Sequence, residues 1–200
     1  MDGKTERARE GDDRELVLRF LAGETGAFDP LVLRHQDRVM NICYRILGDY
    51  EEARDCAQET FIKVYRSLKS FKGESVFSTW LYRIAVNTCK NRLSSSAYRR
   101  RKKMLTLGAA GNGRDDPRRV DPPNGSPTPP ERAENREVER LVQTAIDGLD
   151  ADHKTVVVLR DIEGLSYEEV SRATGFPVGT VKSKLARARE KLKSKLRGNV

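Results

Sequence analysis

A stretch near the C-terminus, residues 164–189, has the pattern of two short helices separated by a tight turn. Ser166 is followed three residues later by Glu169, which is the spacing of a capping box at a helix start. Gly175 predicts the end of the first helix, because glycine readily adopts a positive φ. Pro177 favours a new start, since its fixed φ suits a first helical turn. These signals predict that the stretch forms a helix, a turn and a second helix.

The second of these helices is amphipathic, with an apolar inner side and a basic outer side. Its inner positions recur at helical spacing, at Val181, Leu185, Ala188 and Leu192. Its outer positions are Lys182, Ser183, Ala186 and Arg187. This is the helix-turn-helix layout, in which the second helix enters the DNA major groove. A surface helix with solvated lysines is the alternative, but the coincidence of caps, turn and basic face favours DNA binding.

The charge balance of the chain favours a polyanion as its partner. The 200 residues carry a formal net charge of +8, which suits DNA, RNA or an acidic membrane surface without choosing among them. No apolar run is long enough to span a membrane. The charged N-terminus lacks the apolar core of a signal peptide. The expected location is the cytoplasm.

No pattern in the sequence predicts a cofactor, a metal site or an enzyme. Cys43, Cys56 and Cys89 show no metal-ligand spacing with His35 or His153 and are predicted to be buried free thiols. His35 lies on an apolar helix face and is predicted to be a packed core histidine. There is no phosphate-binding Gly-x-x-x-x-Gly-Lys loop and no nucleophile with a supporting arginine cluster.

A segment rich in Gly, Pro, Asn and Asp divides the chain. Residues 98–130 cannot bury a core and are predicted to be a flexible linker. Residues 12–97 are predicted to form one helical domain and residues 131–197 a second, after a disordered start at residues 1–11. The predicted fold class is all-α, with two small domains. In the second domain, Asp152 is the expected N-cap of the helix that precedes the helix-turn-helix.

The helix predicted from Tyr50 to about Ser70 carries an unusual number of acidic groups in its first half. Favourable interaction with the helix dipole accounts for Glu51 and Glu52, but less well for Glu59. The alternative is a docking surface for a basic protein partner, which includes Asp55 and Gln58.

Residues 71–93 place aromatic side chains beside basic and amide ones, a combination that can hold unstacked bases. For Trp80, which lies on an apolar helical stripe, the core is the favoured location. For Phe71, which lies in a loop, packing and base binding are both open.

Three motifs, in this order along the chain, resemble those of bacterial RNA polymerase sigma factors of the extracytoplasmic-function (ECF) group. They are Asp55-x-x-Gln58-Glu59-Thr60-Phe61, the run from Phe71 to Asn87, and Gly164–Glu169 with Val178–Ser183. The resemblance extends from about Asp12 to Lys195 and leaves out only the linker.

The resemblance implies a role for each domain. The first domain would correspond to region two, which binds the clamp helices of the largest polymerase subunit and opens the −10 element. The second would correspond to region four, which reads the −35 element. The implied clamp-binding residues are Asp55, Gln58 and Glu59. The implied −10 residues are Phe71, Lys72, Gly73, Glu74, Ser75, Asn87, Lys90 and Asn91. The implied −35 residues are Gly179, Thr180, Lys182, Ser183, Lys184, Ala186 and Arg187.

The partners implied are therefore core RNA polymerase and promoter DNA, with an inhibitory anti-sigma factor that is typical of the family. A stand-alone helix-turn-helix regulator is the alternative function. It would leave the motifs between Asp55 and Asn87 without a role.

Overall fold

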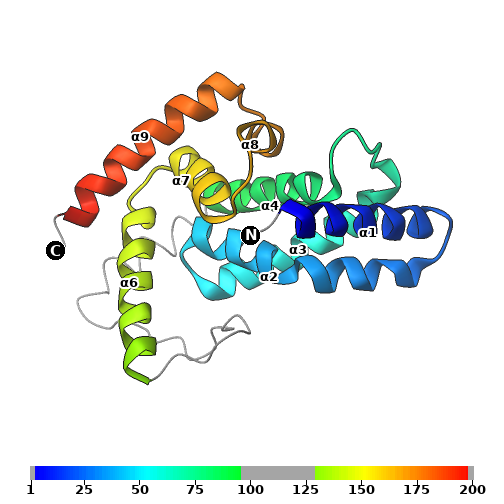
Figure 1. Cartoon of the computed structure of the whole chain (residues 1–200), viewed down its shortest axis with the longest axis horizontal. Coiled ribbons are helices and arrows are strands. Elements are labelled where there is room, and N and C mark those ends of the chain that lie inside the picture. Colours follow the sequence, from blue (N-terminus) through cyan, green and yellow to red (C-terminus); the bar gives the residue numbers. More distant parts are fainter. Residues whose placement is uncertain (1–2, 96–128, 198–200) are drawn as a thin grey trace.

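The computed structural model describes residues 3–95 and 129–197. Side chains are described from Asp12 onward in the first range and from Glu137 onward in the second. Every secondary-structure element in these two ranges is helical (Figure 1). The first domain comprises α1 (Gly3–Leu21), the short helix η1 (Thr25–Ala27), α2 (Phe28–Leu47), α3 (Tyr50–Ser67), the short helix η2 (Leu68–Ser70) and α4 (Phe77–Ser94). The second comprises α6 (Pro129–Asp147), α7 (Ala151–Val157), the π-helical segment η3 (Val158–Ile162), α8 (Tyr167–Thr174) and α9 (Val178–Arg197). The all-α prediction is confirmed.

The helices begin earlier than predicted at the start of both domains. Helix α1 begins at Gly3, so the prediction of disorder is wrong for residues 3–11. Lys, Glu, Arg and Ala dominate these residues, and extending a helix that is already formed is easier than starting one. Helix α6 includes Pro129 and Pro130, which were predicted to end the linker. Proline is tolerated in a first helical turn. The rest of the predicted linker lies outside the described residues.

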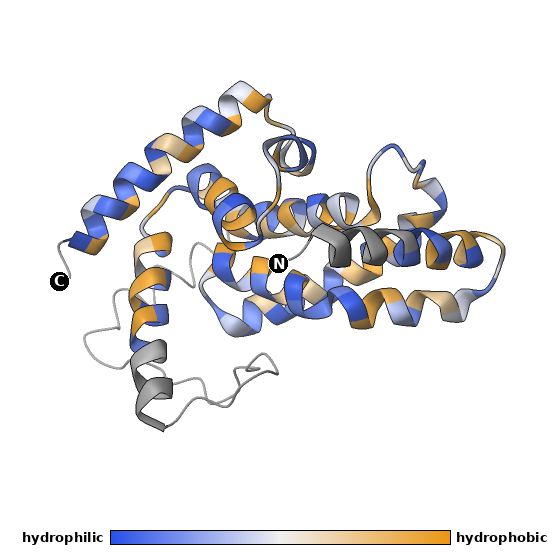
Figure 2. Ribbon diagram, in the orientation of Figure 1, coloured by the Kyte–Doolittle hydropathy of each residue, from blue (hydrophilic) through white to orange (hydrophobic). Residues whose placement is uncertain are grey.

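The first domain is built on α2, α3 and α4, whose apolar faces meet in the interior (Figure 2). Gly48 ends α2 in the left-handed conformation, with φ of +72°. Asp49 then caps α3 by accepting a hydrogen bond from the Glu52 amide. The three cysteines are free and buried among these helices, as predicted. His35 is also a core residue, and its Nε2 lies 2.7 Å from Asp13 Oδ2.

The helix-turn-helix forms as the sequence predicts. The Ser166 hydroxyl accepts a hydrogen bond from the Glu169 amide, and the Glu169 carboxylate accepts one from the Ser166 amide, which completes the capping box. Gly175 ends α8 with φ of +77° and donates its N–H to the Ser171 carbonyl. Val181, Leu185 and Ala188 of α9 are buried, and Leu192 is partly buried.

Gly175→Ala should destabilise the protein by about 1–2 kcal/mol, because a Cβ strains the left-handed conformation. Steric crowding does not contribute to this loss of stability, because no neighbouring atom lies within 4 Å of a Cβ built at this position. Gly179→Ala is the matched control: Gly179 is helical, open and without positive φ, so alanine there should be neutral or stabilising. Urea unfolding of both variants tests this, and equal midpoints would contradict it.

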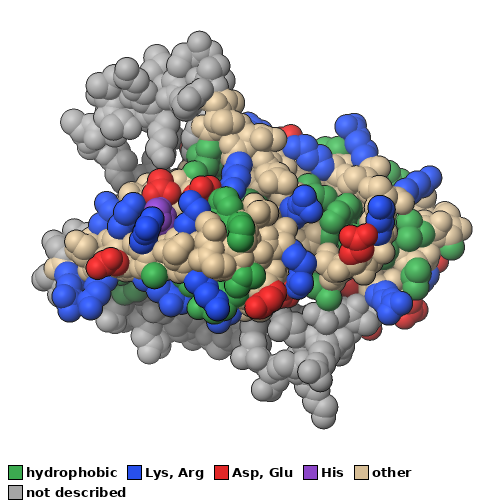
Figure 3. Space-filling model, turned by 90° about the horizontal axis from the view of Figure 1, so that it is seen from above, with side chains coloured by type: hydrophobic (Ala, Val, Ile, Leu, Met, Phe, Trp, Pro, Cys, Tyr) green, Lys and Arg blue, Asp and Glu red, His purple; other side chains and the backbone are tan. Residues whose placement is uncertain are grey.

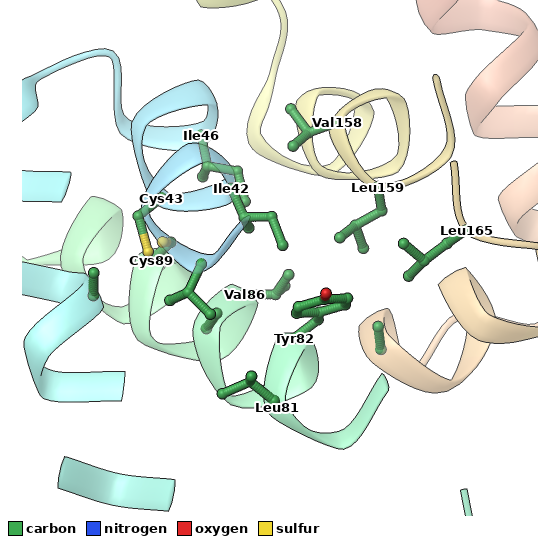
Figure 4. Packing of buried hydrophobic residues seen from close by; sticks show 14 of the residues in the cluster. Ile42, Cys43, Ile46, Leu81, Tyr82, Val86, Cys89, Val158, Leu159 and Leu165 are labelled. Atoms are coloured by element: carbon green, nitrogen blue, oxygen red, sulfur yellow. The ribbon is translucent and has the colours of Figure 1, made fainter. Parts of the chain in front are cut away.

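The two domains pack against each other and share one hydrophobic core. Helix α4 of the first domain packs on α8 of the second, and α2 contacts α6. Figure 4 shows Tyr82 and Val86 of α4 facing Leu159 of η3 and Leu165, which precedes α8. All four side chains are buried, Tyr82 to 2% exposure. We call this packing of the two domains the closed arrangement; nothing in the sequence predicts it.

Candidate nucleic-acid interface

The outer face of α9 is open to solvent in the closed arrangement. Gly179, Lys182, Ser183, Ala186 and Arg187 are exposed. The ammonium group of Lys182 lies 5.4 Å from the centroid of the Tyr167 ring, and the Ser183 hydroxyl donates to the Thr180 carbonyl at 3.0 Å. Thr180 itself is half-buried. This part of the predicted −35 set therefore forms one basic, accessible helix face.

Lys184 does not belong to that face. Its side chain is 25% exposed, and its Nζ lies 3.0 Å from Asp152 Oδ2 of α7. The same ammonium group lies 5.0 Å from the centroid of the Phe176 ring in the turn between α8 and α9. Asp152 was predicted to cap α7, but the N-cap is Asp150, whose side chain accepts from the His153 amide. Because Asp152 does not cap the helix, its carboxylate is available to pair with lysine side chains.

The loop before α4 combines one anchored aromatic ring with exposed polar residues. Phe71 is half-buried and packs against Trp80, with ring centroids 5.1 Å apart, and against Phe77 at 6.1 Å. Lys72, Gly73 and Glu74 are exposed, and Ser75 is half-buried. Gly73 has φ of +70°, a conformation that favours glycine. The Phe71 ring thus fixes the base of the loop, and Trp80 lies in the same cluster, as predicted.

The predicted −10 residues on α4 separate into two directions. Asn87 and Asn91 are exposed and lie one turn apart on the same helix face. Lys90 instead points towards the second domain, where its Nζ lies 3.5 Å from Asp152 Oδ1 and 4.7 Å from the centroid of Phe176. The structure therefore brings Lys90 and Lys184, one from each predicted DNA-binding set, to the same carboxylate.

The acidic side of α3 lies on the surface. Asp55 and Gln58 are exposed, and Glu59 is partly so. Glu59 is paired within the domain, with its carboxylate 2.7 Å from Lys63 Nζ and 3.5 Å from Arg92 Nη2. The hydrogen bond from Lys63 lowers the pKa of the Glu59 carboxyl. We call Asp55, Gln58 and Glu59 the acidic edge.

Glu163, which follows η3, makes a second polar contact between the domains. Its carboxylate accepts a hydrogen bond from Asn41 Nδ2 at 2.5 Å and lies 3.4 Å from Arg38 Nε. Arg38 Nη2 also donates to the Glu163 carbonyl at 3.2 Å. Burial raises the pKa of the Glu163 carboxyl, while Asn41 and Arg38 act in the opposite direction. Sequence reasoning missed this contact because its partners are far apart in the chain.

Cationic side chains are spread over the side of the molecule that carries α8 and α9. Figure 3 shows many Lys and Arg side chains on this side, interspersed with fewer Asp and Glu. Among the described side chains, no group of three or more His, Cys, Asp and Glu residues is placed to hold a metal ion. None of the described helices is both long and apolar enough to cross a membrane.

Comparison with known proteins identifies the two domains separately. Residues 31–101 match the Sigma-70 region 2 family, and residues 139–192 match the Sigma-70 region 4 family. These ranges cover most of α2–α4 and of α6–α9. They therefore include the acidic edge, the loop before α4 and the helix-turn-helix.

Relatives match over almost the whole chain. The RNA polymerase sigma-H factor of Pseudomonas aeruginosa is 43% identical, over 89% of this chain and 90% of its own. The ECF RNA polymerase sigma-E factor of Haemophilus influenzae is 41% identical, over 92% and 95%. That of Escherichia coli K12 is 38% identical, over 92% and 94%.

Solved structures agree with this assignment. CnrH, solved in complex with the cytosolic domain of CnrY, superposes with a TM-score of 0.66 at 26% identity, over 94% of this chain and 99% of its own. The sigma factor RpoE of Bartonella quintana, solved with the anti-sigma factor NepR, has the same fold, with a TM-score of 0.61 at 22% identity over 85% and 96%. From its two family matches and its relatives, the chain belongs to the ECF group of bacterial RNA polymerase sigma factors.

Proposed function

We propose that this sigma factor, acting in transcription initiation, reads the −35 element with its second domain and opens the −10 element with its first. The observation that carries the proposal is the exposed outer face of α9, formed by Lys182, Ser183, Ala186 and Arg187. It lies on the second helix of a helix-turn-helix whose capping box and glycine turn are both formed. A helix placed in this way fits the DNA major groove.

The first domain offers a surface suited to single-stranded DNA. The exposed residues Lys72 and Glu74 of the loop before α4, with Asn87 and Asn91 on α4, combine charge with amide hydrogen-bonding groups. Opening DNA costs about 1.4 kcal/mol per base-pair step, and stacking a freed base on an aromatic surface returns about 1–3 kcal/mol. Capture of one or two bases only roughly offsets a short opened stretch. This chain therefore depends on core polymerase for further contacts.

The acidic edge supplies the proposed polymerase contact. Asp55 and Gln58 are exposed on α3, on a protein whose net charge is +8. A cluster of carboxylates on a basic protein suits a basic partner surface, which the clamp helices of the largest polymerase subunit would provide. Because polymerase and promoter meet in the cytoplasm, the chain would act there.

An inhibitory protein partner is the further element of the proposal. Bartonella quintana RpoE is solved with the anti-sigma factor NepR, and CnrH with the cytosolic domain of CnrY. The similarity of this chain to both over most of its length supports an anti-sigma factor as its regulator. Co-purification of the tagged chain with and without its inducing stress would identify it.

The stand-alone regulator is not favoured, because both Sigma-70 regions are matched and a regulator needs only the second. A gel shift separates the two functions. A sigma factor should shift a promoter duplex strongly only when core polymerase is present. Equal shifts of the duplex with and without polymerase would support the regulator instead.

Arg187→Ala should weaken promoter binding by about 1–3 kcal/mol at one position of the −35 element if the guanidinium reads a base. Binding to a set of duplexes, each with one substituted base pair, tests this. Lys193→Ala, an exposed position further along α9, is the control and should weaken all sequences alike. The same uniform loss for Arg187→Ala would show that Arg187 contacts only phosphate.

A further inference from the structure

The aromatic ring of Tyr167 contacts a cation from each of two other elements of the second domain. Tyr167 is the first residue of α8, the first helix of the helix-turn-helix. The ammonium group of Lys182, on the outer face of α9, lies 5.4 Å from the centroid of this ring. The guanidinium carbon of Arg160, in η3, lies 4.8 Å from the same centroid. Cations at such distances are attracted by the electron-rich face of an aromatic ring.

The Tyr167 ring is held in place by its helix and by its packing. The capping box at Ser166 fixes the backbone at the start of α8. The ring is partly buried and packs against the hydrophobic core. Arg160, which contacts the ring, is itself anchored by a 2.6 Å hydrogen bond from its Nη1 to the Leu165 carbonyl. The ring is therefore a fixed support for Lys182, whose flexible side chain is exposed.

This support leaves the positive charge of Lys182 available. Lys184, on the same helix, pairs with Asp152. Among the described side chains, Lys182 forms no such ion pair. A carboxylate partner would neutralise the ammonium group and occupy its N–H donors, and a contact with DNA needs both. An aromatic ring has no net charge, so it restrains the ammonium group without neutralising it.

A restrained lysine can discriminate between base pairs better than an unrestrained one. Ordering a lysine side chain on binding costs conformational entropy, and a contact that already exists before binding reduces that cost. Lys182 lies near the start of α9, and the start of a recognition helix is the part that contacts base edges. There, lysine can donate to the O6 and N7 acceptors of guanine. A lysine that moves freely can instead follow the nearby phosphates, because it binds them as a point charge.

We propose that Tyr167 is a positioning residue for −35 recognition, whose ring holds the Lys182 ammonium group so that Lys182 reads one base pair. This inference rests on the proposed function, because it takes the outer face of α9 as the −35 surface. The base pair is one that presents acceptors in the major groove, and guanine fits best. Tyr167 acts only through Lys182 and contacts no base itself.

The test measures how core polymerase, carrying each variant of the full chain, binds a set of promoter duplexes. Each duplex differs by one −35 base pair from a promoter that the wild-type chain transcribes. All affinities are measured with polymerase present and at one salt concentration, because phosphate contacts depend on salt. The measured quantity is discrimination, which is the ratio of the affinities for the original and the substituted duplex. Lys182→Met removes the charge and identifies the base pair that Lys182 reads.

Lys182→Met should lower discrimination at one base pair by about fivefold or more. Tyr167→Leu should lower it at the same base pair by about two- to fivefold, which is the effect of losing an exposed cation–π contact. Tyr167→Phe keeps the ring and should retain wild-type discrimination. In the double variant, Tyr167→Leu should have no further effect at this base pair once Lys182→Met is present, because the ring then has no ammonium group to position.

Tyr50→Leu is the matched control. Tyr50 is also partly buried and is also the first residue of a capped helix, α3 in the first domain. Its substitution should leave discrimination unchanged at every −35 base pair. Circular dichroism checks the fold of each variant. Should Tyr167→Leu lose helix content, Tyr167→Met makes the same comparison with a flexible side chain that adapts to irregular packing.

The possible contrary results separate the inference from the proposed function. An equal loss of affinity for all duplexes in Tyr167→Leu, the same loss of discrimination in Tyr167→Phe, or independent effects of Tyr167→Leu and Lys182→Met would overturn the positioning role. Unchanged discrimination in Lys182→Met, with a change in Arg187→Ala, would overturn it as well but leave the −35 surface in place. If neither Lys182→Met nor Arg187→Ala changed discrimination at any −35 base pair, the proposed function of α9 would itself be refuted.

Discussion

Asp55→Lys should abolish association with core RNA polymerase and leave the fold unchanged. Asp55 is exposed on α3 and is not part of the core, so a lysine there should cost little stability. At the proposed docking surface it replaces an attraction by a repulsion, and losing a charged interface partner costs about 2–5 kcal/mol, or roughly 30-fold or more in affinity. Native gel shift of labelled core polymerase measures this loss.

Asp37→Lys is the control for that experiment. Asp37 is exposed on α2 and lies outside the acidic edge, so this variant has the same charge change at a different site. It should retain near wild-type affinity. Glu59 is a less suitable position for this charge reversal, because substituting it would also remove its ion pairs with Lys63 and Arg92. Unchanged binding of Asp55→Lys, or an equal loss in Asp37→Lys, would contradict the docking assignment.

Val170→Asp should unfold the second domain and abolish transcription from promoters that require the −35 element. Val170 is completely buried in α8, and an unpaired carboxylate there costs several kcal/mol, among the largest effects of single substitutions. Helix content from circular dichroism should fall. Association with polymerase through the acidic edge should persist, because α3 belongs to the first domain.

Val138→Asp is the matched control, since the same substitution falls at a position of α6 that is 54% exposed. It should keep the helix content and −35-dependent transcription of the wild type. If Val170→Asp retained full −35-dependent activity, the assignment of that element to the helix-turn-helix would be wrong. If it lost polymerase binding as completely as Asp55→Lys, the division of roles between the domains would be wrong.

Local signals explain why much of the fold could be predicted from the sequence. Ser166 and Glu169 lie three residues apart and satisfy each other, and Gly175 adopts the conformation that only glycine adopts easily. Apolar residues at helical spacing, such as Val181 and Leu185, are buried where the pattern places them. Such features depend on neighbours along the chain, so the sequence contains them directly.

Contacts between the domains have no such local signal. Aspartate is a favourable N-cap residue, so Asp150 and Asp152 are both candidates by residue type. The backbone conformation places Asp150 at the N-cap position of α7. Asp152 then binds Lys90, a residue from the other side of the predicted linker. In the sequence, Lys184 cannot be told apart from the other basic residues of α9. Its position on the helix directs its side chain towards Asp152 of α7. Only the structure therefore separates the exposed members of the predicted site from Lys90 and Lys184, which pair with Asp152.

Run-off transcription with purified core polymerase and a promoter library tests the central claim most directly. Added to core polymerase without another sigma factor, the chain should produce specific transcripts from a subset of templates that share one −35 and one −10 sequence at constant spacing. Core polymerase alone, or with Asp55→Lys, should produce none. Transcripts that do not depend on the added chain, or that show no shared promoter sequence, would contradict the account.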